Sequence, residues 1–219
     1  MPRALFEKTG NAVWISHLDL MRVFQRAFKR AGLLLTHTQG FNPRPSVSIA
    51  LPLSVGIESK CELLDFDLEG EKIPSEDILL RLNENLISGV KVLAVYDDIS
   101  KIKNLAYMDC VLTLEYDAGI PQGCAETLND LFSREEVFVE KRTKNGPKPE
   151  NIIPLIKDME ISAVDEQILE IRVRVCCQNP ALNPMQLMAA VELYLPEMKP
   201  CFVTCRRVEV YDTNESVFR

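Results

Sequence analysis

The stretch SHLDLMRVFQRAFKRAG, residues 16–32, decides how the first half of the chain folds. Its apolar residues recur every three or four positions, which is the spacing of one face of an α-helix. Ser16 is a suitable N-cap, because its side-chain oxygen can accept a hydrogen bond from a free N–H of the first turn. Gly32 supplies the stop signal. The stretch therefore predicts an amphipathic helix over residues 17–31.

Short segments around this helix alternate apolar and polar residues, as β-strands do. In the first half, strands are predicted at residues 5–8, 33–36, 46–51, 61–68 and 90–95. A second helix is predicted at residues 75–86, opened by Pro74. The order of strands and helices is that of the split βαβ arrangement of ferredoxin-like folds.

The second half repeats this pattern without visible sequence identity. Strands are predicted at residues 107–116, 137–142, 168–177 and 201–210, and helices at residues 124–132 and 184–195. A polar stretch, residues 97–104, separates the halves. We therefore predict an α+β fold of two tandem ferredoxin-like halves with antiparallel sheets. Residues 1–98 form the first half, which carries the motifs described below, and residues 105–219 form the second.

Composition is typical of a globular protein, with 47% hydrophobic and 26% charged residues among 219. No run approaches the roughly 18 apolar residues of a membrane span, and the N-terminus lacks the apolar core of a signal peptide. Seven cysteines, an odd number, favour reduced thiols over a disulfide framework. We expect a cytoplasmic protein.

Positive charge is concentrated at the front of the chain. The net charge is −7, which argues against a protein that coats nucleic acid by bulk electrostatics. Residues 1–50, however, hold seven lysines and arginines against two acidic residues, a balance of +5. A basic front therefore precedes an acidic body.

A row of cations recurs on the first predicted helix, and we call it the basic row: Arg22, Arg26, Lys29 and Arg30. Such a row can meet the phosphates of RNA, and Arg44 in a nearby loop can extend it. The alternative is a solvated helix face with no ligand. Residues 141–148, also basic, are a second candidate for phosphate contact.

His17 and Asp19 lie in the first turn of the same helix. A histidine there can act as a general base, with Asp19 orienting it and the arginines holding a phosphate. The alternative is an ordinary first turn with a cap and an acidic residue. A metal-free nuclease would also need a second acid or base, which His37, Asp19 or a tyrosine would have to supply.

A loop with two prolines follows, and we call it the motif loop: Gln39, Gly40, Phe41, Asn42, Pro43, Arg44 and Pro45. It can present backbone amides and an aromatic ring to a ligand, or it can simply connect two strands stiffly. The two histidines, His17 and His37, do not make a metal site without clustered partners. No metal is predicted.

Two cysteines, Cys201 and Cys205, have the spacing of the first two ligands of the C-x3-C-x2-C iron–sulfur motif. The third position is Val208, so the chain is not expected to hold that cluster. Phosphate-binding glycine loops, hydrolase elbows and H-E-x-x-H are also missing from the sequence.

Residues 16–32 resemble the opening motif of the radical-SAM-associated domain family, a family of uncharacterised function. Residues 39–45, 50–53 and 55–59 resemble its second and third blocks. Together these matches cover about the first 70 residues. The resemblance implies a partner, a radical-SAM protein that carries an iron–sulfur cluster and S-adenosylmethionine. Members occur alone or joined to such an enzyme, and this chain is similar to the stand-alone form.

Three functions follow as hypotheses. The favoured one is an accessory module that presents RNA, such as tRNA, to the radical-SAM enzyme through the basic row and the motif loop, with no cofactor and no catalysis of its own. The first alternative is an RNA-processing enzyme with His17 as general base and Arg22 and Arg26 steadying the phosphate. The second is a protein–protein adaptor that docks through Phe41.

Overall fold

The computed structural model describes residues 1–97, 99–143 and 146–219 of the chain. They form two compact units. Unit 1 consists of residues 1–104 together with 217–219, and unit 2 of residues 105–216. None of the helices within the described ranges is long and apolar enough to span a membrane.

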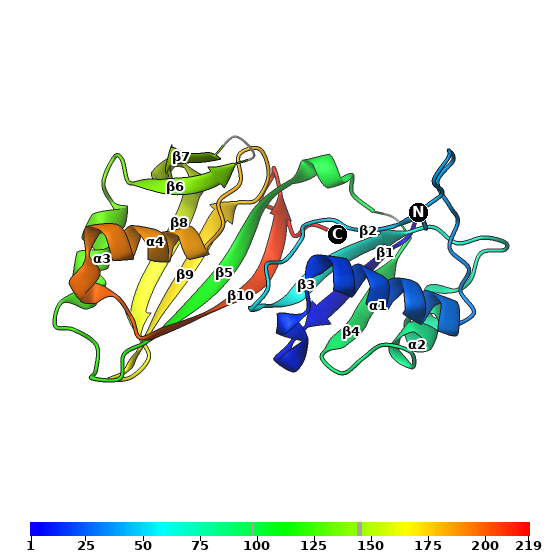
Figure 1. The fold of residues 1–219 in the computed structure, drawn as a ribbon, viewed down its shortest axis with the longest axis horizontal. Helices are drawn as coiled ribbons and strands as arrows, with labels where there is room; N and C mark the ends of the chain where they lie inside the picture. Colours follow the sequence, from blue (N-terminus) through cyan, green and yellow to red (C-terminus); the bar gives the residue numbers. More distant parts are fainter. Residues whose placement is uncertain (98, 144–145) are drawn as a thin grey trace. The chain divides into compact units, whose positions relative to one another are not determined.

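Unit 1 is a four-stranded antiparallel sheet with two α-helices (Figure 1). Its elements are β1 (Arg3–Lys8), η1 (Gly10–Trp14), α1 (His17–Arg30), β2 (Val47–Ile49), β3 (Ile57–Phe66), α2 (Ser75–Asn83), β4 (Val90–Tyr96) and η2 (Ile102–Asn104). The strand order is β4-β1-β3-β2, and every pair is antiparallel. Helix α1 connects β1 to β2, and helix α2 connects β3 to β4. In each case one other strand of the sheet lies between the two connected strands.

The core of unit 1 lies between this sheet and the two helices. Strand alternation places Ala4 and Phe6 of β1 on the helix side. The Phe6 ring meets Phe24 of α1 edge-on, with centroids 4.8 Å apart. Ile78 and Leu82 of α2 are buried in the same cluster. Such burial stabilises each side chain by about 1.5–3 kcal/mol, which explains why α1 turns its apolar face inward.

The opposite face of the unit 1 sheet carries a buried ion pair. Arg3 of β1 and Asp65 of β3 are register partners, and the guanidinium makes two hydrogen bonds to the carboxylate, at 2.6 and 2.9 Å. A third bond from Arg3 reaches the carbonyl of Ser100, at 3.0 Å. The guanidinium also lies over the ring of Phe218, 5.0 Å from its centroid. These contacts tie the chain end to unit 1.

Unit 2 has a sheet of the same internal order (Figure 1). Its elements are β5 (Leu105–Glu115), α3 (Cys124–Phe132), β6 (Phe138–Thr143), β7 (Gly146–Asn151), η3 (Ile153–Leu155), β8 (Ile156–Ala163), β9 (Ile168–Cys176), α4 (Met185–Tyr194), η4 (Pro196–Met198) and β10 (Phe202–Asp212). The order is β10-β5-β9-β8, again antiparallel. Strands β6 and β7 form a separate ribbon.

The prediction of an α+β fold with antiparallel strands is confirmed, with four α-helices among the described residues. Three expected details are wrong. Residues 33–36 form only an isolated bridge, Leu35 to Leu68, and the chain then enters the hairpin in which His37 is bridged to Pro45. The strand predicted at residues 137–142 exists as β6, but it pairs with β7 and does not join the main sheet. The main-sheet strand in that place is β8, which the sequence analysis missed.

The missed strands have a physical explanation. β8 lies at the edge of its sheet, and two adjacent charged residues, Lys157 and Asp158, break its polar–apolar alternation at a register shift, so only residues 158–163 alternate. β7 contains two prolines, which a two-stranded ribbon tolerates because one side of each strand needs no ladder partner. The last three residues, 217–219, group with unit 1 and not with the second half.

Candidate nucleic-acid interface

Helix α1 begins as its sequence predicts. Ser16 is the N-cap, and its hydroxyl oxygen accepts a hydrogen bond from the backbone N–H of Asp19 at 3.2 Å. The same hydroxyl donates to the Asp19 carboxylate at 2.7 Å. Four apolar residues of α1 are buried against the sheet: Leu20, Phe24, Ala27 and Phe28. The other face of α1 is therefore left to solvent.

The basic row occupies that solvent face. Its four residues are all exposed. At 3.6 residues per turn they fall within a sector of about 100° around the helix axis. Arg22 pairs with Asp19 at 2.8 Å, and Arg30 donates to the carbonyl of Asn85. Within the described part of the chain, Arg26 and Lys29 have no side-chain hydrogen bond or ion pair. Two cations are thus available to an external anion.

Asp19 is the one acidic neighbour of this row on α1. The hydrogen bond from Ser16 lowers its pKa, and the hydrogen bond from Arg22 lowers it further. The carboxylate therefore stays ionised at neutral pH and offsets part of the charge of Arg22. Arg26 and Lys29 lie farther along the helix, beyond its single acidic residue.

His17 lies on the other side of α1. Helical rotation places it about 140° from Arg22 and about 180° from Arg26. It is half-buried, and its Nδ1 atom is buried without a hydrogen-bond partner among the described residues. The structure therefore does not bring His17 together with the arginines. Asp19, the expected orienting group, is engaged by Ser16 and Arg22 instead.

The motif loop is the tip of a narrow hairpin. At its neck, the N–H of Thr38 donates to the carbonyl of Arg44 at 2.9 Å, and the N–H of Arg44 donates to the Thr38 hydroxyl at 3.0 Å. The bond from Ser46 N–H to the carbonyl of Thr36, at 2.7 Å, closes the base. All of residues 39–44 are exposed, and Phe41 is fully exposed. Gln39, Gly40, Asn42 and Pro43 thus surround a protruding ring.

A pocket of about 310 Å³ joins the end of α1 to the base of this hairpin. Lys29 lines it from the helix, and His37 and Pro45 line it from the hairpin. Glu69 lies on the same wall, with its carboxylate 4.0 Å from Nδ1 of His37. The fold thus brings one cation of the basic row and the foot of the motif loop to one concavity.

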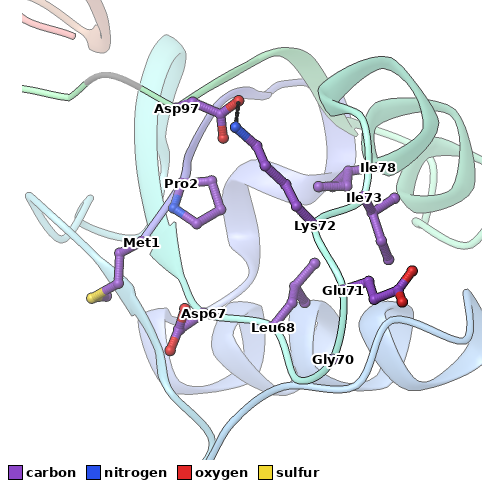
Figure 2. A pocket seen from close by; sticks show the side chains of 10 residues that line it. All are labelled: Met1, Pro2, Asp67, Leu68, Gly70, Glu71, Lys72, Ile73, Ile78 and Asp97. Carbon is purple, nitrogen blue, oxygen red and sulfur yellow. Dashed lines mark ion pairs between the residues drawn. The ribbon is translucent and has the colours of Figure 1, made fainter.

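Another pocket of unit 1, about 380 Å³, has the opposite character. Figure 2 shows its lining, in which Lys72 reaches to Asp97 at 3.1 Å. Asp67 and Glu71 are the other charged residues of the wall. Three carboxylates against one ammonium repel a phosphate group, so this pocket does not extend the basic surface.

Sequence reasoning missed Trp14 and Lys8. Trp14 ends η1, two residues before the cap of α1, and its side chain is largely exposed. Lys8 is fully buried, and its ammonium donates to the carbonyls of Val13 and Ile15, at 3.1 and 2.8 Å. Burial lowers the pKa of Lys8, while the nearby Glu62 carboxylate opposes that shift. The signal in the sequence was a lone tryptophan in a turn before a helix cap.

The second basic stretch, residues 141–148, adds few available cations among the described residues. Lys141 is engaged by Glu150 at 2.7 Å and by the carbonyl of Ala181 at 3.0 Å. Lys148 is exposed, whereas residues 144–145 lie outside the described residues. Cys205 is buried and Cys201 is exposed. No group of three or more metal-ligating side chains is found in the described ranges.

Among solved structures, a chain of the "Crystal Structure of a Cbf5-Nop10-Gar1 Complex" matches with a TM-score of 0.52 and 8% identity, over 95% of this chain and 48% of that chain. A chain of the "Structure of H/ACA RNP bound to a substrate RNA containing 2'-deoxyuridine" has a TM-score of 0.46 and 8% identity, over 94% and 46% of the two chains. An unknown protein from Galdieria sulphuraria has a TM-score of 0.27 and 9% identity, over 94% and 97%.

This chain spans about half the length of the first two of those chains. At such low identity the first match shows a shared fold and nothing more, and the other two are too distant to carry an argument. No curated protein sequence matches the chain. One family does match, over residues 2–184, and it is described as "Uncharacterized protein conserved in bacteria (DUF2344)". The chain belongs to this bacterial family, DUF2344.

Proposed function

We propose that this chain is an RNA-binding accessory module that presents RNA, such as tRNA, to a radical-SAM enzyme. The observation that carries the RNA part is the solvent face of α1. Four cations lie there within one sector of the helix, and two of them, Arg26 and Lys29, have no partner among the described residues. A polyanion is the ligand that such a row fits best.

Binding by this row has a definite electrostatic form. From Arg22 to Arg30 the row extends about 12 Å along the helix axis. Each phosphate that a lysine or arginine neutralises releases a condensed counterion, so the affinity falls steeply with salt. The rest of the chain is acidic, which confines the contact to this face. Arg44, at the neck of the motif loop, extends the contact beyond the pocket that Lys29 and Pro45 share.

We also propose that both units are ferredoxin-like halves. Their strand orders, β4-β1-β3-β2 and β10-β5-β9-β8, support this, because each follows the split βαβ order when counted within its unit. In unit 2 the β6–β7 ribbon is then an insertion after the first helix. The likeness to the Cbf5-Nop10-Gar1 chain concerns the fold alone, so the charge of α1 carries the RNA proposal.

The radical-SAM partner rests on the resemblance of residues 16–59 to the radical-SAM-associated domain family. In this proposal the partner holds the iron–sulfur cluster and S-adenosylmethionine, and this chain supplies binding. The position of His17 argues against RNA cleavage by this chain, because His17 lies on the opposite side of α1 from Arg22 and Arg26. Titration of a radical-SAM enzyme from the same genome with the purified chain tests the partnership, and its absence would remove that part of the proposal.

A second candidate, a protein–protein adaptor, is favoured by one observation. Phe41 is fully exposed at the tip of the hairpin. An aromatic ring in this position is a common anchor for a partner protein. Loss of enzyme binding in Phe41→Ala, with RNA affinity unchanged, would support docking through the loop.

The test of RNA binding is a titration of labelled RNA at two salt concentrations. Arg26→Ala/Lys29→Ala removes the two unpartnered cations without breaking a contact of the fold. Lys60→Ala/Lys91→Ala, two exposed lysines of unit 1, is the matched control. We expect the first variant to lose roughly 10-fold in affinity at low salt and the salt slope to fall by about 2. No binding by wild type at low salt, or equal loss in the control, would overturn the proposal.

A further inference from the structure

Trp14 is an unusual exposed side chain. The residue is 68% exposed although tryptophan carries one of the largest apolar side chains. Leu18 in the first turn of α1 and Val55 in the loop before β3 are exposed as well, at 67% and 53%. The ring lies against that loop, since a methyl group built on Gly56 would come within 3.4 Å of its Cζ3 atom. An apolar patch thus marks the N-terminal end of α1.

The backbone that carries Trp14 is held firmly on both sides. The carbonyls of its two neighbours, Val13 and Ile15, both accept hydrogen bonds from the buried ammonium of Lys8. The Val13 carbonyl also accepts from the N–H of Gly56, at 2.9 Å. Burying an ammonium group is unfavourable unless its protons are bonded. Here the buried group fixes the segment from which an exposed ring projects.

The start of η1 is fixed too. The N–H of Thr9 donates to the carbonyl of Gly89 at 2.8 Å. Gly89 has a φ of +83°, and a methyl group there would lie 2.4 Å from the carbonyl oxygen of Thr9. The backbone at Thr9 can therefore lie this close to residue 89, just before β4, only because glycine has no side chain. The backbone from which the ring projects is thus fixed before any ligand arrives, which lowers the conformational entropy that binding must remove.

The patch leads into the basic row. Leu18 is one helical turn before Arg22, and rotation along α1 separates them by only about 40°. Along the chain, exposed Trp14 and Leu18 therefore come directly before the cations, at the N-terminal end of the helix. Aromatic platforms beside tracks of positive charge are the usual way in which proteins bind single-stranded nucleic acid.

We infer that Trp14 is a stacking platform for an unpaired base of an RNA whose phosphates follow the basic row. This inference rests on the proposed function and specifies its substrate class: the RNA is single-stranded where it passes the start of α1. The charge of the row favours a nucleic acid over an apolar protein segment as the occupant. Stacking tolerates any base, so the platform selects an unpaired strand and not a sequence.

The chain contains one tryptophan, so its fluorescence reports on this site alone. We would titrate the full chain with a dye-labelled oligouridine and follow tryptophan emission and dye anisotropy together. An abasic strand of equal length and an RNA duplex are the comparison ligands. We expect oligouridine to quench the emission, and the abasic strand and the duplex to leave it unchanged.

Variants separate stacking from folding. Trp14→Ala is expected to weaken oligouridine binding by roughly 5- to 150-fold, the range for one stacked base, while Trp14→Phe keeps most of the affinity. Leu193→Ala, an exposed apolar residue of unit 2, is the control and should bind as wild type. Circular dichroism melts check that the Trp14 variants remain folded.

The outcomes distinguish this inference from the proposed function. Anisotropy that shows binding, with no quenching and with Trp14→Ala equal to wild type, overturns the platform and leaves the basic row as the RNA contact. Equal quenching by the duplex also overturns it. Absence of any binding in the anisotropy titration removes both proposals, and the exposed ring is then a contact for a protein.

Discussion

Units 1 and 2 each have an arginine–aspartate ion pair between the same two neighbouring strands of the sheet. In unit 1, Arg3 of β1 binds Asp65 of β3 through two hydrogen bonds. In unit 2, Arg174 of β9 binds Asp109 of β5 in the same way, at 2.7 and 3.0 Å. Both pairs join the first and third strands of a unit, with the charges exchanged. Each arginine also lies over an aromatic ring, Arg3 over that of Phe218 and Arg174 over that of Tyr211.

The two pairs differ in burial. The side chains of Arg3 and Asp65 are 1% and 12% exposed, against 25% and 29% for Arg174 and Asp109. The helix surfaces differ as well, because α1 carries four cations whereas α3 and α4 carry none. The two units thus differ in charge: unit 1 buries Arg3, Lys8, Glu62 and Asp65, whereas Arg207 is the buried charged residue of unit 2 among the described residues.

The largest expected effect separates the two ion pairs. Asp65→Asn leaves the Arg3 guanidinium buried without its counter-charge and should lower the free energy of unfolding by about 3–5 kcal/mol. Asp109→Asn should lower it by only about 1 kcal/mol, because water reaches Arg174. Urea denaturation of both variants measures the difference. Equal losses would show that burial does not distinguish the pairs.

Glycine substitutions test how closely the backbone is packed at one turn of each unit. Gly89→Ala in unit 1 places a methyl group against the Thr9 carbonyl at positive φ, and we expect a loss of roughly 2–3 kcal/mol. Gly123→Ala in unit 2, at a φ of +70° with open space around it, should lose only about 1 kcal/mol. Thermal melts provide the measurement, and a larger loss at Gly123 would reverse the comparison.

Alkaline pH should act on the units in opposite directions. The pKa of Lys8 is lowered by burial, so between that pKa and 10.5 the unfolded state binds more protons, and the contribution of Lys8 to stability rises with pH. The pKa of Tyr116 in unit 2 is raised, first by burial and then by its hydrogen bond with Cys124. Above about pH 10 the unfolded tyrosine ionises first, so its contribution to stability falls.

Stability measured from pH 8.5 to 11 in wild type, Lys8→Met and Tyr116→Phe tests these signs. Relative to wild type, the slope should become less positive in Lys8→Met and less negative in Tyr116→Phe. Slopes identical to wild type in both variants would mean that neither group titrates differently on folding.

The smallest effect concerns helix starts. Ser16→Ala removes the hydroxyl that caps α1 and should lower the free energy of unfolding by about 1 kcal/mol. Helix α3 has Gly123 at its N-cap and α4 has Pro184, neither with a side-chain cap bond. Gly123→Ser should not bring α3 the same gain, because the φ of +70° strains any L side chain and is not the extended backbone of a serine N-cap. A neutral Ser16→Ala would show that packing alone fixes the start of α1.

Local patterns predicted much of the fold and part of the candidate site. Helix α3 spans the residues expected of it, and α1 ends within one residue of its prediction, because both depend on periodicity and end signals within one segment. The basic row was predictable for the same reason. Strand β8 was missed although residues 158–163 alternate, because the adjacent charged residues Lys157 and Asp158 break the pattern at the start of the strand.

By itself, the sequence determined α1, its cap and the cations on one of its faces, since helical geometry places residues three and four apart together in any tertiary context. The same geometry sets His17 on the opposite side of α1 from the arginines. Only the tertiary structure decided that the buried Lys8 ammonium bonds the carbonyls on either side of Trp14 and that Arg3 meets Asp65. Those relations depend on strand register and on how a helix packs against its sheet. Both are set by contacts between residues far apart in the chain, which no local pattern contains.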